Sequence, residues 1–278
     1  MKNLLKTTAL SAILLMFAGV LTSCEEIGKG YVDSEINIRL VETYHTSPRT
    51  LQFFCYTTKI YPCINFPIML ELNQESNNIN VVFKGVPEDI GICLTAIGPA
   101  TTLINLGSLN IGTHRLQFQN GNTIHTGELI VTTDSYKINF PNNPDFRFTN
   151  TPLNKIPENT IWGIIGWHNE ETYTLTQSFL TDLMDLGAEK KPFTPGYYTD
   201  FVIDQNHEKT TPDASWGFWF HQLFIFHYSG DINDVKQLLK QYARYHREEI
   251  SIRISTDKGE RFMSWMYPQV RGVEQPWY

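Results

Sequence analysis

Residues 114–131 read HRLQFQNGNTIHTGELIV, with short runs of strand-forming residues on both sides of Asn120-Gly121-Asn122. In the first run, apolar and polar side chains alternate, which is the period of a strand with one buried face. An Asn-Gly pair readily adopts the positive backbone angles of a tight hairpin turn. The stretch therefore predicts a hairpin of two antiparallel strands, 114–118 and 126–131.

Similar short runs extend on both sides of this hairpin, from residue 36 to about residue 148. The further predicted strands are 36–40, 51–60, 68–72, 79–83, 92–97 and 136–140. Turn-forming residues separate them, among them Ser76-Asn77-Asn78 and Gly98-Pro99. Seven or eight short strands in about 110 residues, without a helical period, predict an antiparallel β-sandwich of immunoglobulin-like architecture over residues 35–148.

The next stretch, 141–160, reads PNNPDFRFTNTPLNKIPENT and is rich in proline and asparagine. Proline lacks an amide proton and restricts the backbone, so the stretch predicts a linker or an extended crossover. We place the linker between the two domains at residues 149–159.

Beyond residue 160 the hydrophobic period changes. The predicted elements are strands at 161–168, 197–203, 216–228 and 250–254, and helices at 172–186 and 232–246. Asp231 is a suitable N-cap for the second helix, and Gly187 is a natural end for the first. The order strand–helix–strand–strand–helix–strand predicts a ferredoxin-like α+β domain over residues 160–278, including a C-terminal tail. In such a domain both helices cover one face of a four-stranded sheet.

The N-terminus reads as a segment that is removed during export. Lys2 and Lys6 precede an uncharged, mostly apolar run over 7–21, which is too short for an ordinary membrane-spanning helix. The run closes with LTSC at 21–24, which resembles the lipobox of bacterial lipoproteins. That resemblance implies cleavage before Cys24 and acylation of its thiol. The alternative is an ordinary secretory signal with a chance cysteine.

Two further features resemble Bacteroides-type surface lipoproteins. The pair Glu25-Glu26 is similar to their surface-export signal, and residues 109–131 are similar to the last hairpin of their small sandwich domains. The resemblance implies a lipoprotein signal peptide over 1–23 and a tether over 24–34. Acylated Cys24 would then hold the protein in outer-membrane lipid, exposed at the cell surface. The alternative is that Glu25 and Glu26 only make the tether polar and are no export signal.

Three cysteines remain in the body of the chain: Cys55, Cys63 and Cys93. Outside the cytoplasm these thiols could form one disulfide at most, with one thiol left over. Buried free thiols are an equal alternative. His221 and His227 are six residues apart, roughly 20 Å along a strand, and so could not share one metal ion. We therefore predict neither a metal site nor a cofactor.

One face of the C-terminal sheet is expected to be free of helices. Alternate residues of a strand share a face, and the more polar set of strand 216–228 should lie on this one. The candidate ligand-binding residues are Trp219, His221, His227, Tyr198 and Arg253. An aromatic and polar platform of this kind binds sugar rings or another protein. The alternative is that another part of the chain packs against this face.

Charge and motifs narrow the function. The chain has 22 Lys and Arg against 29 Asp and Glu, a net charge of −7, which argues against a nucleic-acid partner. No nucleophile, phosphate-loop or metalloprotease motif stands in the sequence, so no catalytic residue is predicted. We expect a non-catalytic cell-surface lipoprotein that binds a glycan or protein partner or belongs to a surface assembly. The alternative is an extracellular hydrolase acting on a polysaccharide or a peptide.

Overall fold

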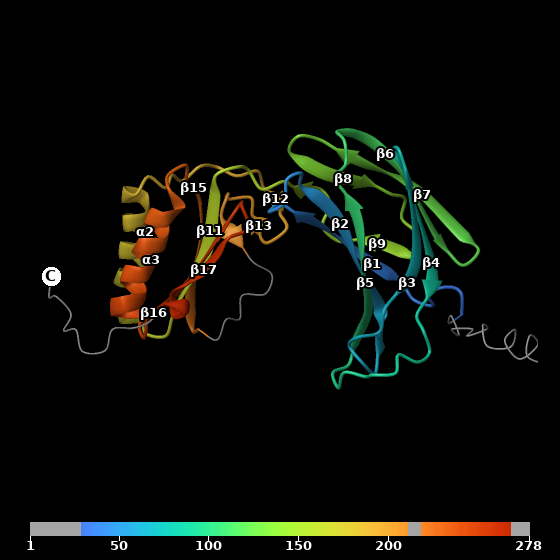
Figure 1. Ribbon diagram of the computed structural model, residues 1–278, viewed down its shortest axis with the longest axis horizontal. Helices are drawn as coiled ribbons and strands as arrows, with labels where there is room; N and C mark the ends of the chain where they lie inside the picture. The colour runs from blue at the N-terminus through green and yellow to red at the C-terminus, as the bar shows by residue number, and fades with distance from the viewer. Residues whose placement is uncertain (1–28, 211–217, 268–278) are drawn as a thin grey trace, which may run out of the picture.

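The computed structural model describes residues 29–210 and 218–267, which form three sheets and two α-helices (Figure 1). The predicted signal peptide, Cys24, the first part of the tether and the C-terminal tail from residue 268 lie outside these residues. Within them, no helix has the length and apolar character needed to span a membrane.

The first two sheets lie face to face in the N-terminal half (Figure 1). The first has the order β5-β2-β1-β9 and consists of β1 (Ile36–Thr43), β2 (Thr50–Tyr61), β5 (Gly98–Gly107) and β9 (Phe146–Phe148). The second has the order β14-β13-β12-β10-β8-β7-β6-β4-β3. Its strands are β3 (Met69–Glu75), β4 (Asn78–Gly85), β6 (Gly112–Asn120), β7 (Thr123–Val131), β8 (Ser135–Asn139), β10 (Leu153–Asn154), β12 (Gly196–Tyr197), β13 (Val202–Ile203) and β14 (Lys209–Thr210).

The two sheets bury a common apolar core. Every second residue of β4 is buried, as the alternating pattern predicts. Phe53 and Phe83 of the two sheets each meet Phe118 edge to face, with ring centroids 6.1 and 6.0 Å apart. The predicted hairpin is confirmed, since β6 pairs with β7 in antiparallel fashion across Gly121, which has a positive φ of 58°.

Two predictions for this half are wrong. Residues 92–97 lie in an exposed loop, which is held by the disulfide at Cys93 and by the Asn65 amide, which donates to the Ile92 carbonyl and accepts from the Leu94 N–H; the strand is β5 instead. The strands are also not all antiparallel, because β4 pairs with β6, and β1 with β9, in parallel. Between β4 and β6 the chain crosses to the other sheet to form β5, and this excursion lets β6 run in the direction of β4.

The third sheet forms the C-terminal half. It is antiparallel throughout with the order β15-β11-β16-β17. Its strands are β11 (Thr160–Trp167), β15 (Phe220–His227), β16 (Ile250–Thr256) and β17 (Arg261–Met263). Helices α2 (Tyr173–Asp185) and α3 (Ile232–His246) cover one face, and short 3-10 turns lie at Glu170–Thr172 and Ser264–Met266 (Figure 1).

Local signals place both helices correctly. The Asp231 carboxylate accepts a hydrogen bond from the backbone N–H of Asn233, so it caps α3 as predicted. Gly187 follows α2 with a positive φ of 99°. The apolar faces of the helices pack on alternate residues of the sheet. That core includes Ile161, Ile165, Phe224, Phe226, Ile250, Ile252 and Ile254 from the strands and Phe179, Leu183, Val235 and Leu239 from the helices.

The predicted strand 197–203 does not belong to the third sheet, which corrects the expected order. A turn, in which the Tyr198 N–H donates to the Phe201 carbonyl, breaks the segment into β12 and β13. Both strands extend the second sheet through β10, which lies within the expected linker 149–159. The edge of β15 holds a single bridge, Glu189 to His227. The second sheet is therefore continuous between the two halves of the protein.

Candidate functional site

The face of the third sheet that points away from the helices carries Trp162, Ile164 and Gly166 of β11. Across this face, Ile164 lies between Leu223 of β15 and Arg253 of β16 in the strand register. These positions alternate with the residues that face the helices. Leu223 and Arg253 therefore lie on the predicted helix-free face, about one strand spacing on either side of Ile164.

Part of this face is covered by other segments of the chain. We call the buried group of Tyr44, Ile156, Trp162, Phe193, Tyr198, Phe201 and Ile203 the junction cluster. The Trp162 ring contacts the rings of Tyr44, which directly follows β1, and of Phe201, with centroid distances of 5.7 and 5.4 Å. Tyr198 stacks on Phe201 at 4.8 Å and donates its hydroxyl to the Thr194 carbonyl at 3.1 Å. The predicted ligand residue Tyr198 is thus buried in the junction.

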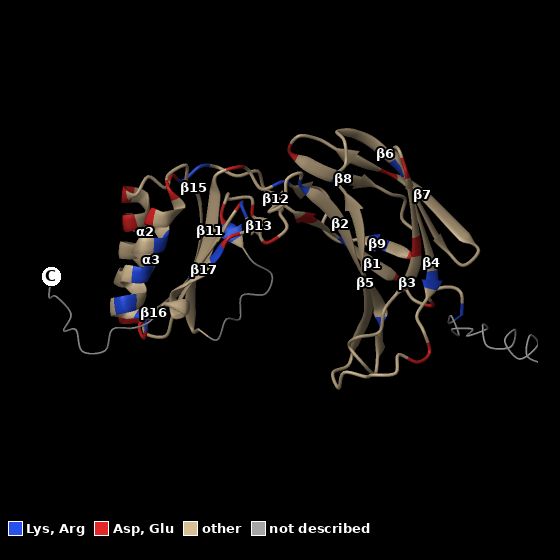
Figure 2. Cartoon of the chain, in the orientation of Figure 1, with Lys and Arg blue, Asp and Glu red and all other residues tan. Residues whose placement is uncertain are grey.

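A cavity of about 200 Å³ remains open beside the junction cluster. We call it the cationic pocket, because three cationic side chains line it: Lys209 of β14, Arg253 of β16 and Arg261 of β17. Its apolar lining includes Ile164, Leu223 and Met263, and Ser255 contributes a hydroxyl. In Figure 2, basic and acidic segments adjoin between β17 and β13.

Asp200 is the acidic group that lines this pocket among the described residues. Its carboxylate accepts a hydrogen bond from the Tyr44 hydroxyl and lies 3.7 Å from a guanidinium nitrogen of Arg261. The carboxylate thus already has two partners. Among the described residues, the lining of the pocket holds two more positive charges than negative ones.

Burial changes the acidity of two of the cations. Burial lowers the pKa of Lys209 to about 8, although the charge of Asp200 acts in the opposite direction. The Lys209 ammonium donates a hydrogen bond to the Gly163 carbonyl at 3.2 Å. Burial, followed by the charge of Arg261, lowers the pKa of Arg253. Burial is the largest cause of both pKa shifts.

The other predicted ligand residues lie apart from this pocket. Trp219 is 81% exposed and meets His168 edge to face at 6.4 Å. His221 is exposed near that end of β15, where it pairs with Gly166. His227 lies at the opposite end, with its Nδ1 3.2 Å from the Lys191 ammonium. Of the five candidate residues, Arg253 alone lines the cationic pocket, so the structure does not bring the five together.

Sequence reasoning missed Lys209 and Arg261. A signal for Arg261 was present, because Asp257-Lys258-Gly259 is a turn sequence that ends one strand of a hairpin and begins another. No comparable signal marks Lys209, which lies in a strand of two residues. Only the packing of β14 near β15 brings it to the third sheet.

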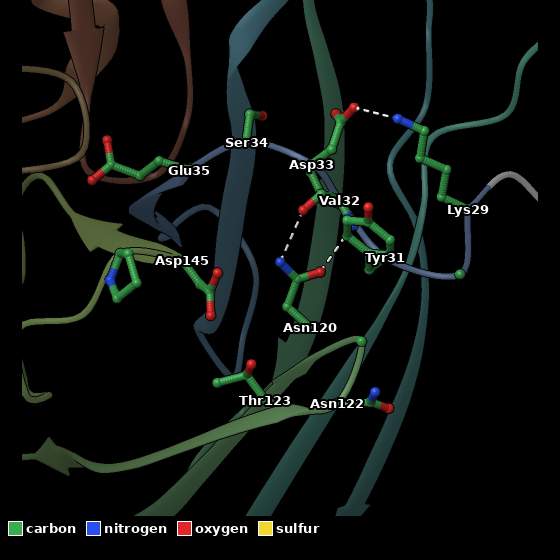
Figure 3. A pocket seen from close by; sticks show the side chains of 13 residues that line it. Lys29, Tyr31, Val32, Asp33, Ser34, Glu35, Asn120, Asn122, Thr123 and Asp145 are labelled. Carbon is green, nitrogen blue, oxygen red and sulfur yellow. Dashed lines mark hydrogen bonds and ion pairs between the residues drawn. The ribbon is translucent and has the colours of Figure 1, made fainter.

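A second hollow, of about 890 Å³, lies at the start of the described chain (Figure 3). The side-chain amide of Asn120 clamps Val32, accepting from its N–H at 2.8 Å and donating to its carbonyl at 2.9 Å. Asp33 forms ion pairs with Lys29 and Lys59, and the hydrogen bonds with these lysines lower its pKa. Residues 29–34, expected as tether, are thus packed on the sandwich.

The cysteines separate into a bridge and a buried thiol. Cys63 and Cys93 form a disulfide, with Cα atoms 5.4 Å apart. Cys55 is a free thiol, and burial raises its pKa, so it is protonated at neutral pH. Within residues 29–210 and 218–267, no group of three or more His, Cys, Asp or Glu side chains could hold a metal ion.

Comparison of the chain with protein-family models, with curated protein sequences and with solved structures finds no match. Function is therefore inferred from the geometry and electrostatics of the cationic pocket.

Proposed function

We propose that the protein is a lipoprotein of the outer membrane, anchored through acylated Cys24 and exposed at the cell surface, that binds a glycan or a protein partner. It belongs, in this proposal, to the Bacteroides-type surface lipoproteins. The observation that carries the binding role is the cationic pocket. It concentrates positive charge on a face of the third sheet that the helices leave uncovered, in a chain whose net charge is −7.

The position of the pocket supports this role. Four residues lie between Cys24 and the first described residue, Lys29, so the Cα atoms of Cys24 and Lys29 are at most about 18 Å apart. The described chain begins beside β4, and the sandwich lies between this point and the third sheet (Figure 1). An anchor at Cys24 would hold the hollow around Asn120 close to the bilayer. The cationic pocket would lie on the half of the protein that is farther from the membrane.

The proposal includes a finer assignment of the fold. An immunoglobulin-like origin of the N-terminal half is supported by two sheets packed face to face and by the β6–β7 hairpin. A ferredoxin-like origin of the C-terminal half is supported by the antiparallel order β15-β11-β16 with both helices on one face. The strand that would complete this sheet beside β15 has joined the second sheet instead.

An extracellular hydrolase remains the alternative function. Most glycosidases use two carboxyl groups placed roughly 5–10 Å apart across the scissile bond. Asp200 is the carboxylate of the described chain that lines the cationic pocket, and it accepts a hydrogen bond from the Tyr44 hydroxyl. A carboxylate held in this way is better suited to orienting Arg261 than to transferring a proton to a substrate. The pocket therefore supports binding rather than hydrolysis.

The binding role can be tested by blocking the pocket without changing its charge. Ser255→Tyr places a ring in the pocket, whereas Ser251→Tyr places the same ring four residues away on the same face of β16. The purified protein is screened against a glycan array and against outer-membrane extracts. We expect Ser255→Tyr to abolish the binding that is found and Ser251→Tyr to preserve it. Binding that survives Ser255→Tyr contradicts this site, and turnover of a bound glycan favours the hydrolase.

The anchor has its own test. Cells are labelled with an alkyne fatty acid, and we expect the wild-type chain to take up the label. Cys24→Ala should take up none and should be released or mislocalised. A labelled Cys24→Ala chain contradicts the lipid anchor.

A further inference from the structure

We infer that the cationic pocket binds one acidic sugar residue, whose carboxylate or sulfate is held by Lys209, Arg253 and Arg261. This inference rests on the proposed binding role of the same face and names the chemical class of its ligand.

The charge of the pocket selects an anion. In the described part of the chain, three cations and one carboxylate line it, and Asp200 already accepts a hydrogen bond from Tyr44. In an acidic protein, a local surplus of positive charge draws anions toward the site and repels cations. Guanidinium groups bind planar and tetrahedral oxyanions with paired hydrogen bonds, and two of them face this cavity.

The environment of Lys209 also favours an anionic ligand. Within the described part of the chain, its ammonium donates one hydrogen bond, to the Gly163 carbonyl at 3.2 Å, and burial lowers its pKa. Removing a cation from water is unfavourable unless an anion compensates its charge. An oxyanion in the pocket would supply the compensation that Asp200 provides only in part.

The size and lining of the pocket favour a sugar. A volume of about 200 Å³ is smaller than the roughly 300–1,000 Å³ of pockets that enclose a whole drug-sized ligand. With about 30 Å³ per water molecule, it corresponds to some seven waters, the scale of one sugar ring. Ile164, Leu223 and Met263 offer an apolar wall for the C–H groups of the ring, and the Ser255 hydroxyl offers a hydrogen-bond partner. A terminal or single acidic residue of a longer glycan thus fits better than the whole chain.

The first test compares probes by calorimetry on the purified full chain. The probes are trigalacturonate, which carries carboxylates, a chondroitin sulfate disaccharide, which adds a sulfate, neutral maltotriose, and hexaglutamate as an acidic peptide. We expect at least one acidic sugar to bind, and maltotriose and hexaglutamate to bind at least tenfold more weakly. The stronger of the two acidic sugars identifies the preferred oxyanion. Absence of binding by both acidic sugars, equal binding of maltotriose, or stronger binding of hexaglutamate overturns the inference.

The second test removes single charges. Arg253→Gln and Lys209→Met should each lower the affinity for the acidic sugar by about tenfold to a hundredfold, because each removes a charged hydrogen bond. Arg244→Gln changes the same charge on an exposed position of α3, across the sheet, and should leave affinity unchanged. If Lys209 stabilises the fold, Lys209→Met should have a lower melting temperature than the wild-type protein. If Lys209 serves to bind the ligand, the melting temperature of Lys209→Met should be unchanged or higher, since methionine avoids the burial of a charge.

The pH dependence gives a third readout. A bound anion raises the pKa of Lys209 above its free value of about 8, so affinity should fall as the pH rises from 8 to 10. The charged and titratable groups of the described chain near Lys209 are Asp200, Arg253 and Arg261, which line the pocket, and Tyr44, which donates to Asp200; burial raises the pKa of Tyr44. Lys209→Arg should bind without this decline. An identical decline in Lys209→Arg contradicts the role of Lys209.

These tests separate the inference from the proposed function. If Ser255→Tyr blocks a ligand whose affinity is unaffected by Lys209→Met and Arg253→Gln, the pocket binds, but it does not select acidic sugars. If Ser255→Tyr blocks nothing, both conclusions fail together.

Discussion

The two faces of the third sheet are buried in different ways. The helix-covered face packs mainly apolar side chains, such as Ile165, Phe226 and Ile252, against α2 and α3 from the same half of the chain. The opposite face is covered by the junction cluster, to which Tyr44 comes from the N-terminal half, and it leaves the cationic pocket open. The first face therefore stabilises the domain, whereas the second joins the halves and offers charged groups to a ligand.

The difference between the two faces explains why the charged pocket lies on the face without helices. A face buried by dedicated helices excludes charge, because an unpaired charge there would be strongly destabilising. A face buried by segments from elsewhere is covered incompletely, and Lys209, Arg253 and Arg261 occupy the remaining space. Predictions that compare matched residues on the two faces test this view.

The largest effect is expected for the core of the helix-covered face. Phe226→Ala should lower the free energy of unfolding by about 3–5 kcal/mol, because it leaves a cavity between sheet and helices. Phe201→Ala removes an equally buried ring from the junction, where the two halves can move together and fill the cavity. Its loss of unfolding free energy should therefore lie at the lower end of this range, about 3 kcal/mol. Urea denaturation measures both. A larger loss for Phe201→Ala contradicts the comparison.

Two glycines of β11 give the next contrast. A methyl group at Gly163 would collide with the backbone carbonyl of Arg253 and with the Phe224 ring, and neither can move easily. Gly163→Ala should therefore destabilise the protein by about 3 kcal/mol. At Gly166 the methyl group would meet only the Phe218 ring among its nearest atoms, so Gly166→Ala should cost under about 1 kcal/mol. Equal thermal shifts for the two variants contradict this expectation.

Two tyrosines that donate to carboxylates provide a finer comparison. Tyr242 donates to Asp182 at 2.7 Å between the helices, and Tyr44 donates to Asp200 at the junction. Each substitution by phenylalanine should cost about 1.5–2 kcal/mol, the value of a hydrogen bond to a charged group. Tyr44→Phe should also weaken anion binding, because it frees Asp200 to compete for Arg261. Tyr242→Phe is the control, and an equal loss of binding in both variants contradicts the assignment.

The smallest effect is expected at Glu42, which lies beside the junction, where its N–H donates to the Thr199 hydroxyl. Burial raises the pKa of Glu42 more than Arg49 lowers it. The folded state thus binds this proton more tightly than the unfolded chain, so the contribution of Glu42 is most favourable at low pH and declines as the pH rises through its folded pKa. Glu42→Gln should stabilise the protein by under about 1 kcal/mol at pH 7 and have no effect below about pH 4.

Asp33 is the control for this pH dependence. Its hydrogen bonds with Lys59 and Lys29 lower its pKa, so its contribution is present at neutral pH and is lost as the pH falls through the folded pKa. Asp33→Asn should therefore destabilise the protein at pH 7, with the opposite sign to Glu42→Gln. Denaturation curves between pH 3 and 8 measure both variants, and shifts of the same sign contradict the electrostatic account.

The elements that were predicted well carry local signals. The boundaries of α3 match the prediction, because the Asp231 cap and the apolar stripe both lie within the helix. The hairpin β6–β7 follows from its Asn-Gly turn. The prediction failed at 92–97, where an apolar run is exposed because the Cys63–Cys93 bridge and Asn65 hold it as a loop. Hydrophobicity alone does not distinguish such a loop from a strand.

The candidate site was predicted only in part, for a related reason. Strand alternation correctly placed Arg253 on the face opposite the helices. It also grouped His221 with His227, although they lie at opposite ends of β15, and it could not show that Tyr198 is buried at the junction. Alternation specifies a face of a strand, but neither a position along it nor what covers that face.

The sequence by itself determined the helices, most of the strands, the turns and the side of the third sheet that faces the helices, because caps, turn residues and hydrophobic periods act over a few neighbouring residues. Only the tertiary structure decided that β12 to β14 extend the second sheet and that Lys209 reaches Gly163. Contacts such as that between Tyr44 and Asp200, which are 156 positions apart, depend on how the halves pack. The cationic pocket is formed by such contacts, and no local pattern encodes them.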